Sequence, residues 1–286
     1  FDFHLETKGL LMAYKTSHAE KEESEISKWA KDLGIKVEQF SKEQVLKIQP
    51  DTAMDIAGAF WYKSDAHTTP ELFINNLKDY LIKKGVRFKL ENTVKYFQKN
   101  NKQIQKVVTD KGIFEADEFV LSTGAWSQQI LKDLGIKLLI QPGKGYRINV
   151  YKSTGITQPA ILLESKVAVT PMDGFTRFGG TMEISGINHR TNIRRVQAIA
   201  DSVTKYYPTL EIPKTSIDNV QSGLRPLSPD GLPFIGRHSK IKNMVLATGH
   251  SMMGWSLGPA TGRLVTEVIS GKKISMDLKP FLPERI

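Results

Sequence analysis

The residue most clearly suited to chemistry is Arg225, which stands immediately before Pro226 in a segment rich in glycine and proline, residues 222–236. A guanidinium held by such a fixed backbone can grip a carboxylate through two parallel hydrogen bonds. Most arginines are solvated or paired at the surface, so Arg225 alone would be weak evidence for a binding site. The segment that follows it strengthens the interpretation.

Residues 243–255 combine an apolar run with two glycines, Gly249 and Gly254. The pattern predicts a buried strand over 244–248, a loop, and a helix from about 256 to 270. A helix N-terminus exposes backbone N–H groups and the positive end of the helix dipole, and glycine lets a ligand approach closely. This turn therefore suits a ligand atom that is anionic or becomes so.

Hydrophobic periodicity predicts the elements that position these residues. Strands are expected at residues 9–15, 86–90, 93–98, 104–109, 118–122, 147–150, 160–163, 167–171, 176–179 and 244–248. Helices are expected before Gly34 and at residues 41–48, 70–84, 127–135 and 193–206. The alternating strands between residues 146 and 220 predict an antiparallel sheet inserted into an α/β framework.

Three of these elements carry more detailed expectations. The helix before Gly34 has an apolar stripe, and the helix at 70–84 has a face expected to be buried. These residues are Ile26, Trp29, Ala30 and Leu33 in the first helix, and Leu72, Phe73, Leu77, Tyr80 and Leu81 in the second. The strand at 118–122 is apolar enough to be buried on both faces, and it ends in a second strand–glycine–helix junction at Gly124.

Composition excludes several classes of protein. The 286 residues suffice for one large or two closely joined domains. The net charge of +10 comes from lysines and arginines scattered among acids, so we expect no nucleic-acid binding. Without cysteine there is no disulfide framework and no thiol nucleophile, and His67 near Asp65 lacks the third ligand of a metal site. We expect a cytoplasmic protein, with a peripheral membrane location as the alternative.

Four motifs in this order resemble the flavin-dependent D-amino acid oxidase superfamily, and most closely its D-amino acid dehydrogenase and glycine oxidase branch. They are residues 144–146, 178–183, 223–236 and 248–255. The resemblance runs over nearly the whole chain and implies an α/β (α+β) fold class. It implies an incomplete FAD-binding three-layer ββα domain plus an antiparallel-sheet substrate domain.

One departure from the family pattern is large. Members open with a strand, a Gly-x-Gly-x-x-Gly turn and a helix that hold the FAD pyrophosphate, and no such fingerprint occurs here. We therefore expect a truncated chain, the C-terminal part of a longer flavoenzyme, which binds FAD weakly or not at all by itself. The sheet edge and helix face left uncovered would then favour self-association, unless the missing N-terminal segment covers them.

The resemblance also implies a division of the chain and roles for particular residues. Residues 1–60 and 143–222 would form the substrate domain, and residues 61–142 and 223–286 the FAD-binding domain. Arg225 would bind the substrate carboxylate, with Tyr146 and Met252 in the substrate pocket. Cofactor contacts would come from Val94, Gly124, Trp126, Gly249, His250, Ser251, Met252, Met253, Gly254, Trp255 and Ser256.

Several of these assignments have plain structural alternatives. Tyr146 and Val94 could be ordinary core residues, the turn at Gly124 could need glycine for its geometry alone, and glycines of the last helix could serve tight packing. For His250 we favour a structural or flavin-contacting role over that of a general base. The apolar Met252 favours larger neutral D-amino acids over glycine.

The implied activity is FAD-dependent oxidative deamination of a D-amino acid, with hydride passing from Cα to the flavin and electrons then passing to oxygen or a quinone. A glycine-, sarcosine- or imino-acid-type amine oxidase is the closest alternative. A non-redox carboxylate-binding module, or a subunit that needs a partner chain, is the alternative of another class. A yellow preparation with a flavin spectrum would exclude that last reading.

Overall fold

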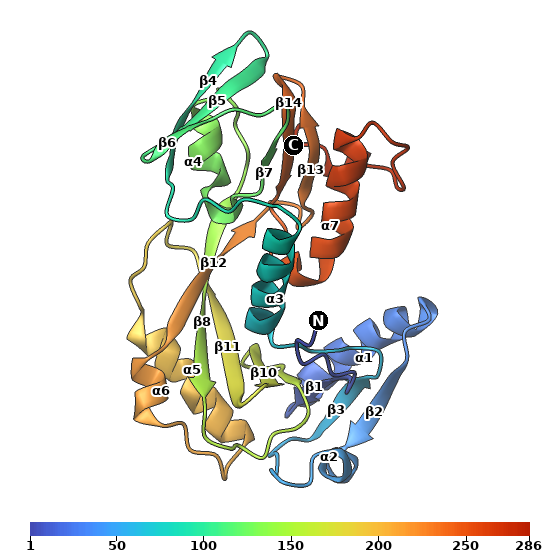
Figure 1. Ribbon diagram of the computed structural model, residues 1–286. Coiled ribbons are helices and arrows are strands. Elements are labelled where there is room, and N and C mark those ends of the chain that lie inside the picture. Colours follow the sequence, from blue (N-terminus) through green and yellow to red (C-terminus); the bar gives the residue numbers. More distant parts are fainter. The chain divides into compact units, whose positions relative to one another are not determined.

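The computed structural model describes residues 1–286, which form two compact units built from alternating stretches of the chain (Figure 1). The first comprises Phe1–Phe88, Gly145–Thr181 and Arg190–Ser222, and the second comprises Lys89–Lys144, Met182–His189 and Gly223–Ile286. Residues 61–88 thus belong with the first unit and Met182–His189 with the second. The division into a substrate domain and an FAD-binding domain stays a prediction.

The first unit is built on an eight-stranded sheet, and three of its strands also contribute residues to the second unit. Its order is β12 (Gln221–Leu227), β8 (Gln141–Val150), β11 (Phe175–Glu183), β10 (Val167–Met172), β9 (Ala160–Leu162), β1 (Leu10–Tyr14), β3 (Gly58–Tyr62) and β2 (Val37–Ser41). β9 runs parallel to β1, while β1 pairs antiparallel with β3. The pairings of β9 with β10 and of β10 with β11 are antiparallel, as predicted for residues 146–220, and the sheet as a whole is mixed because β9 is parallel to β1.

Five helices belong to this unit. They are α1 (Ser17–Asp32), α2 (Lys42–Ile48), α3 (Pro70–Lys83), α5 (Ile193–Tyr206) and α6 (Lys214–Asp218). α5 buries Val196, Ile199 and Val203 in the same core as Phe178 of β11, which accounts for its 3.6-residue periodicity. None of the chain's helices is both long and apolar enough to cross a lipid bilayer.

Of the apolar stripe predicted for α1, only Ala30 is buried. Trp29 is 67% exposed and Leu33, just beyond the helix, is 81% exposed. The buried residues of the helix are Ala19, Glu23, Ser27 and Ala30. The short side chains of Ala19, Ser27 and Ala30 permit close packing, and buried Glu23 accepts a hydrogen bond of 2.6 Å from the Tyr62 hydroxyl. Similarly, no residue of α3 is fully buried.

The second unit holds two three-stranded sheets. One is the antiparallel sheet of β4 (Val94–Asn100), β5 (Gln103–Thr109) and β6 (Gly112–Phe114). The other has the order β13 (Phe234–His238), β14 (Ile241–Thr248) and β7 (Phe119–Leu121). The helical elements are η1 (Gly124–Trp126), α4 (Ser127–Lys132), α7 (Gly254–Ile269) and η2 (Lys279–Phe281).

Two expectations for strands are wrong. Residues 86–90 form no strand, because Gly85 takes a left-handed φ of +87° and the Val86 N–H closes α3 by donating to the Leu81 carbonyl at 3.0 Å. β7 is not buried on both faces, since Val120 is 46% exposed. Its neighbour Leu121 does enter the core with Leu131 of α4, so β7 presents only one face to the interior.

Candidate active site

The two strand–glycine–helix junctions lie side by side in the second unit. β14 pairs parallel with β7, so the turns after both strands meet at the same end of the sheet. Hydrogen bonds among three hydroxyl groups, a hydroxyl relay, link the two junctions. Ser127 Oγ lies 3.1 Å from Thr123 Oγ1 and 2.9 Å from Thr248 Oγ1. Sequence reasoning missed this relay, because isolated serines and threonines at strand ends look like ordinary capping residues.

The loop between β14 and α7 needs glycine at its first position. Gly249 has a φ of +79°, and a Cβ there would stand 2.8 Å from the Phe234 ring. α7 itself begins after Met253 without a side-chain cap, and its first turn contains no acidic residue. The positive end of this sixteen-residue helix is therefore not neutralised by its own side chains.

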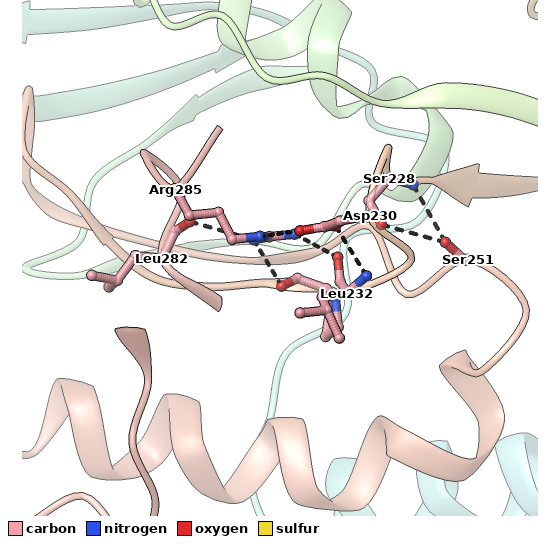
Figure 2. Close-up of polar contacts among 7 residues, drawn as sticks. Ser228, Asp230, Leu232, Ser251, Leu282 and Arg285 are labelled. Carbon is pink, nitrogen blue, oxygen red and sulfur yellow. Dashed lines mark hydrogen bonds and ion pairs between the residues drawn. The ribbon is translucent and has the colours of Figure 1, made fainter. Parts of the chain in front are cut away.

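Arg225 lies on β12 close to this loop, within the same unit. The Ser251 N–H donates to the carbonyl of Pro226, the residue after Arg225, at 3.0 Å. Ser251 Oγ in turn accepts from the Ser228 N–H at 3.3 Å, as Figure 2 shows. Burial lowers the pKa of Arg225, yet a guanidinium stays charged at neutral pH. A fixed positive charge thus accompanies the helix N-terminus.

Two further residues predicted to contact the cofactor line one cavity of about 500 Å³ in the second unit. Val94 of β4 and Trp126 of η1 contribute apolar surface. The other lining residues are Asn92, Thr93, Lys95, Phe97, Thr123, Gln129, Ile130 and Asp133. Apolar walls with a few amide, hydroxyl and charged groups suit a planar heteroaromatic group such as part of a dinucleotide.

His250 is tied to α7 through its ring. His250 Nε2 lies 2.8 Å from Thr261 Oγ1, whose residue is buried in the helix. Burial lowers the pKa of His250 and so favours its neutral imidazole. This contact fixes the loop against the helix and agrees with a structural role, while contact with flavin stays a prediction.

The remaining candidates are placed differently. Met252 is 68% exposed, and Met253, Gly254, Trp255 and Ser256 are also exposed. These residues form the surface of the loop and of the first turn of α7.

Tyr146 belongs to the first unit, where its ring is buried. Its hydroxyl accepts a hydrogen bond of 3.0 Å from the Asn192 N–H. Contact between Tyr146 and a substrate stays a prediction.

Comparison with known proteins places this arrangement in a family. The sequence profile of the family described as "FAD dependent oxidoreductase" (DAO) matches residues 1–268. A D-amino acid dehydrogenase of Bradyrhizobium diazoefficiens is 31% identical over 262 residues, covering 89% of this chain and 61% of the relative. One from Neisseria meningitidis serogroup C is 33% identical over 278 residues, covering 95% and 66%. The chain thus spans about three fifths to two thirds of the length of these relatives.

Solved structures share the fold. Glycine oxidase from Geobacillus kaustophilus superposes with a TM-score of 0.89 at 23% identity, covering 100% of this chain and 76% of that protein. L-Proline dehydrogenase from P. horikoshii gives a TM-score of 0.83 at 22% identity, covering 99% and 77%. With the profile match over most of its length, the chain belongs to the family of FAD-dependent oxidoreductases.

Proposed function

We propose that this chain takes part in the FAD-dependent oxidation of a D-amino acid to the corresponding imino acid, which water then hydrolyses to a 2-oxo acid and ammonia. The observation that carries the proposal is the hydrogen bond from Ser251 to the Pro226 carbonyl, which couples the strand of Arg225 to the glycine loop at the N-terminus of α7. Curated relatives above 30% identity, named D-amino acid dehydrogenases, support the choice of substrate.

In this proposal, residues of this chain bind and orient the substrate. Arg225 binds the carboxylate of the amino acid through two parallel N–H donors of its planar guanidinium and so fixes the position of Cα. The helix N-terminus beyond Gly249 would favour negative charge on a bound flavin, and FAD would supply the hydride acceptor for Cα. Loop residues from His250 to Ser256 would meet the flavin ring, and the cavity beside Val94 and Trp126 would take another part of the dinucleotide. No general base is required from this chain.

An amine oxidase of the glycine or sarcosine type is the second candidate, and the fold shared with glycine oxidase is compatible with it. Met252 is exposed and apolar, so the loop offers an apolar contact at this position and not a second positive charge beside Arg225. Such a contact favours the larger neutral D-amino acids of the first candidate over glycine. A non-redox carboxylate-binding module is disfavoured by family membership. Oxygen and a quinone both remain acceptors to be tested for the electrons.

We also propose that a strand and helix from outside residues 1–286 complete the flavin site. Two surfaces of the second unit support this. β7 is the edge strand of its sheet, and a Cβ on Gly258 or Gly262 of α7 would meet nothing within 4 Å. The test is an FAD titration of residues 1–286 and of the full-length gene product. We expect markedly weaker binding by the shorter chain, and equal, tight binding would overturn this proposal.

Turnover tests the activity itself. The full-length gene product, assayed with a dye acceptor, should oxidise neutral D-amino acids and release ammonia, and it should leave the L-enantiomers unchanged. Faster turnover of glycine or sarcosine would favour the second candidate. A protein that contains flavin yet oxidises none of these amines would contradict both.

A further inference from the structure

Near the end of the chain, Arg285 makes a dense set of contacts with the loop that joins β12 to β13. Its guanidinium pairs with both carboxylate oxygens of Asp230, with Nε–Oδ2 at 2.8 Å and Nη2–Oδ1 at 3.0 Å (Figure 2). It also donates to the carbonyls of Leu232 at 2.6 Å, Pro233 at 3.1 Å and Leu282 at 3.3 Å. The side chain of Arg285 is only 9% exposed.

This set of contacts is stronger than that of a surface ion pair. A bidentate arginine–carboxylate pair fixes distance and orientation together, whereas an exposed lysine pair fixes neither. The same guanidinium satisfies three backbone carbonyls, so truncating it would leave several acceptors without their donor. Hydrogen bonding from Arg285 also holds the pKa of Asp230 at about 2, so the pair stays ionised well into the acid range.

Two routes connect Arg285 to the loop between β14 and α7. In the first, the loop held through Asp230 includes Ser228, whose N–H donates to Ser251 Oγ at 3.3 Å. The Ser251 N–H then holds the Pro226 carbonyl, next to Arg225.

In the second route, the Arg285 guanidinium stacks on the Phe234 ring, 4.0 Å from its centroid. That ring packs so closely against Gly249 that a Cβ there would stand 2.8 Å away. Both routes end in the loop between β14 and α7, the first at Ser251 and the second at Gly249.

We propose that Arg285 is a positioning residue that sets the relative placement of Arg225 and the loop before α7. This deepens, and rests on, the proposed function, because its consequence is a correctly placed carboxylate grip. Arg285 lies beyond residue 268, where the family profile stops matching, so the family match assigns it no role. The residue acts through others and touches neither carboxylate nor flavin in this scheme.

Amide hydrogen exchange tests the contact directly and needs neither flavin nor substrate. In the Arg285→Gln variant we expect the Ser251 and Ser228 amides to exchange roughly tenfold faster or more, while amides of β4 and β5 keep their rates. The Arg285→Lys variant, which keeps the charge without the fork, should show an intermediate increase. Should Arg285→Gln fail to fold, Asp230→Asn breaks the ion pair with little change of shape.

A matched control exists on the same strand as Phe234. Arg237 also makes a bidentate pair, with Glu118 at 2.7 and 2.9 Å, at the other end of β13. Arg237→Gln should lower stability without accelerating exchange at Ser251. Unchanged Ser251 exchange in Arg285→Gln, or a uniform acceleration over the whole unit, would overturn the proposal.

Kinetics supply the second readout, in the flavin-loaded full-length protein. For Arg285→Gln we expect kcat/KM for the D-amino acid to fall roughly tenfold, chiefly through KM, because a displaced Arg225 weakens carboxylate binding in ground and transition states alike. Normal KM with faster Ser251 exchange would contradict the functional consequence. A wild-type protein without activity would contradict the proposed function instead. Amide hydrogen exchange at Ser251 would then decide alone whether Arg285 holds the loop between β14 and α7.

Discussion

At the scale of single residues, the proposed function depends on one cation, Arg225, which neighbouring residues hold in position. Arg225 is partly buried on β12, and the residue after it receives a hydrogen bond from the loop before α7. A guanidinium in this setting has lost part of its hydration, so an ion pair with a carboxylate is stronger than at an exposed surface. The charge and the fork geometry should therefore both matter.

Replacing Arg225 should separate these two properties. For Arg225→Ala we expect a loss of about 2–5 kcal/mol of transition-state binding, a fall in kcat/KM of roughly thirtyfold to several thousandfold. Arg225→Lys should fall between this and wild type, since it keeps the charge alone. Steady-state assays with a D-amino acid would measure both, with Arg237→Gln as the control. Wild-type kcat/KM in Arg225→Ala would contradict the assigned role.

A pH dependence follows from Asp230. Its pKa of about 2 lies below the ordinary value of 3.8, so its ion pair stabilises the fold fully above about pH 4 and loses that contribution as the pH falls from 3.8 towards 2. The difference in unfolding free energy between wild type and Asp230→Asn should thus be constant near neutrality and shrink below pH 4. Denaturant unfolding at a series of pH values measures it, and a difference unchanged at pH 2.5 would speak against the ion pair.

At the scale of elements, two glycines of one region should respond in opposite ways to alanine. Gly249→Ala introduces a side chain at a φ of +79° and into the Phe234 ring, so it should destabilise the chain by about 1–3 kcal/mol. Gly258→Ala meets open space inside α7 and should leave stability equal or raise it by about 0.5–1 kcal/mol. Denaturant unfolding of residues 1–286 compares the two, and equal effects would contradict the placement of Gly249.

The same glycine gives a second, independent comparison. If a helix from outside residues 1–286 packs against α7, Gly258→Ala should weaken FAD binding by the full-length protein while leaving the stability of the shorter chain intact. A full-length Gly258→Ala variant that binds FAD normally would indicate that this face of α7 stays open.

Elements also show what the sequence could and could not reveal. α5 was predicted at its observed bounds, because its apolar residues repeat every three to four positions against a single core. The periodicity of Ile26, Trp29, Ala30 and Leu33 correctly predicted the helix α1, but only Ala30 of these four is buried, together with Ala19, Glu23 and Ser27. The parallel pairing of β9 with β1 escaped prediction, because it joins segments about 150 residues apart.

Some residues of the candidate site could be predicted from the sequence, and others could not. Arg225 and the glycine loop were predictable, since their residue types lie within a short, distinctive stretch of sequence. The contacts made by Ser127 and by Arg285 were not. Each depends on a partner far away along the chain, Thr248 for the first and Asp230 for the second, and an isolated serine or a terminal arginine carries no such information.

At the scale of the whole molecule, an uncovered strand edge should govern behaviour in solution. β7 pairs on one side only, and its exposed Val120 adds apolar surface there. Because an unpaired edge is a template for another strand, residues 1–286 should self-associate as the concentration rises. Val120→Lys should reduce association, while Ile26→Lys, at a similarly exposed apolar position on helix α1 that offers no unpaired strand edge, should not. Sedimentation velocity would decide, and a monomer at all concentrations would refute the expectation.

The most direct test of the central claim is anaerobic reduction of the flavin in the full-length gene product. The purified, flavin-loaded protein is mixed without oxygen with single neutral amino acids of either configuration, and the oxidised-flavin absorption is followed. The account predicts that D-enantiomers bleach this band, that L-enantiomers do not, and that Arg225→Ala needs far higher concentrations. A bound flavin that no D-amino acid reduces would contradict it.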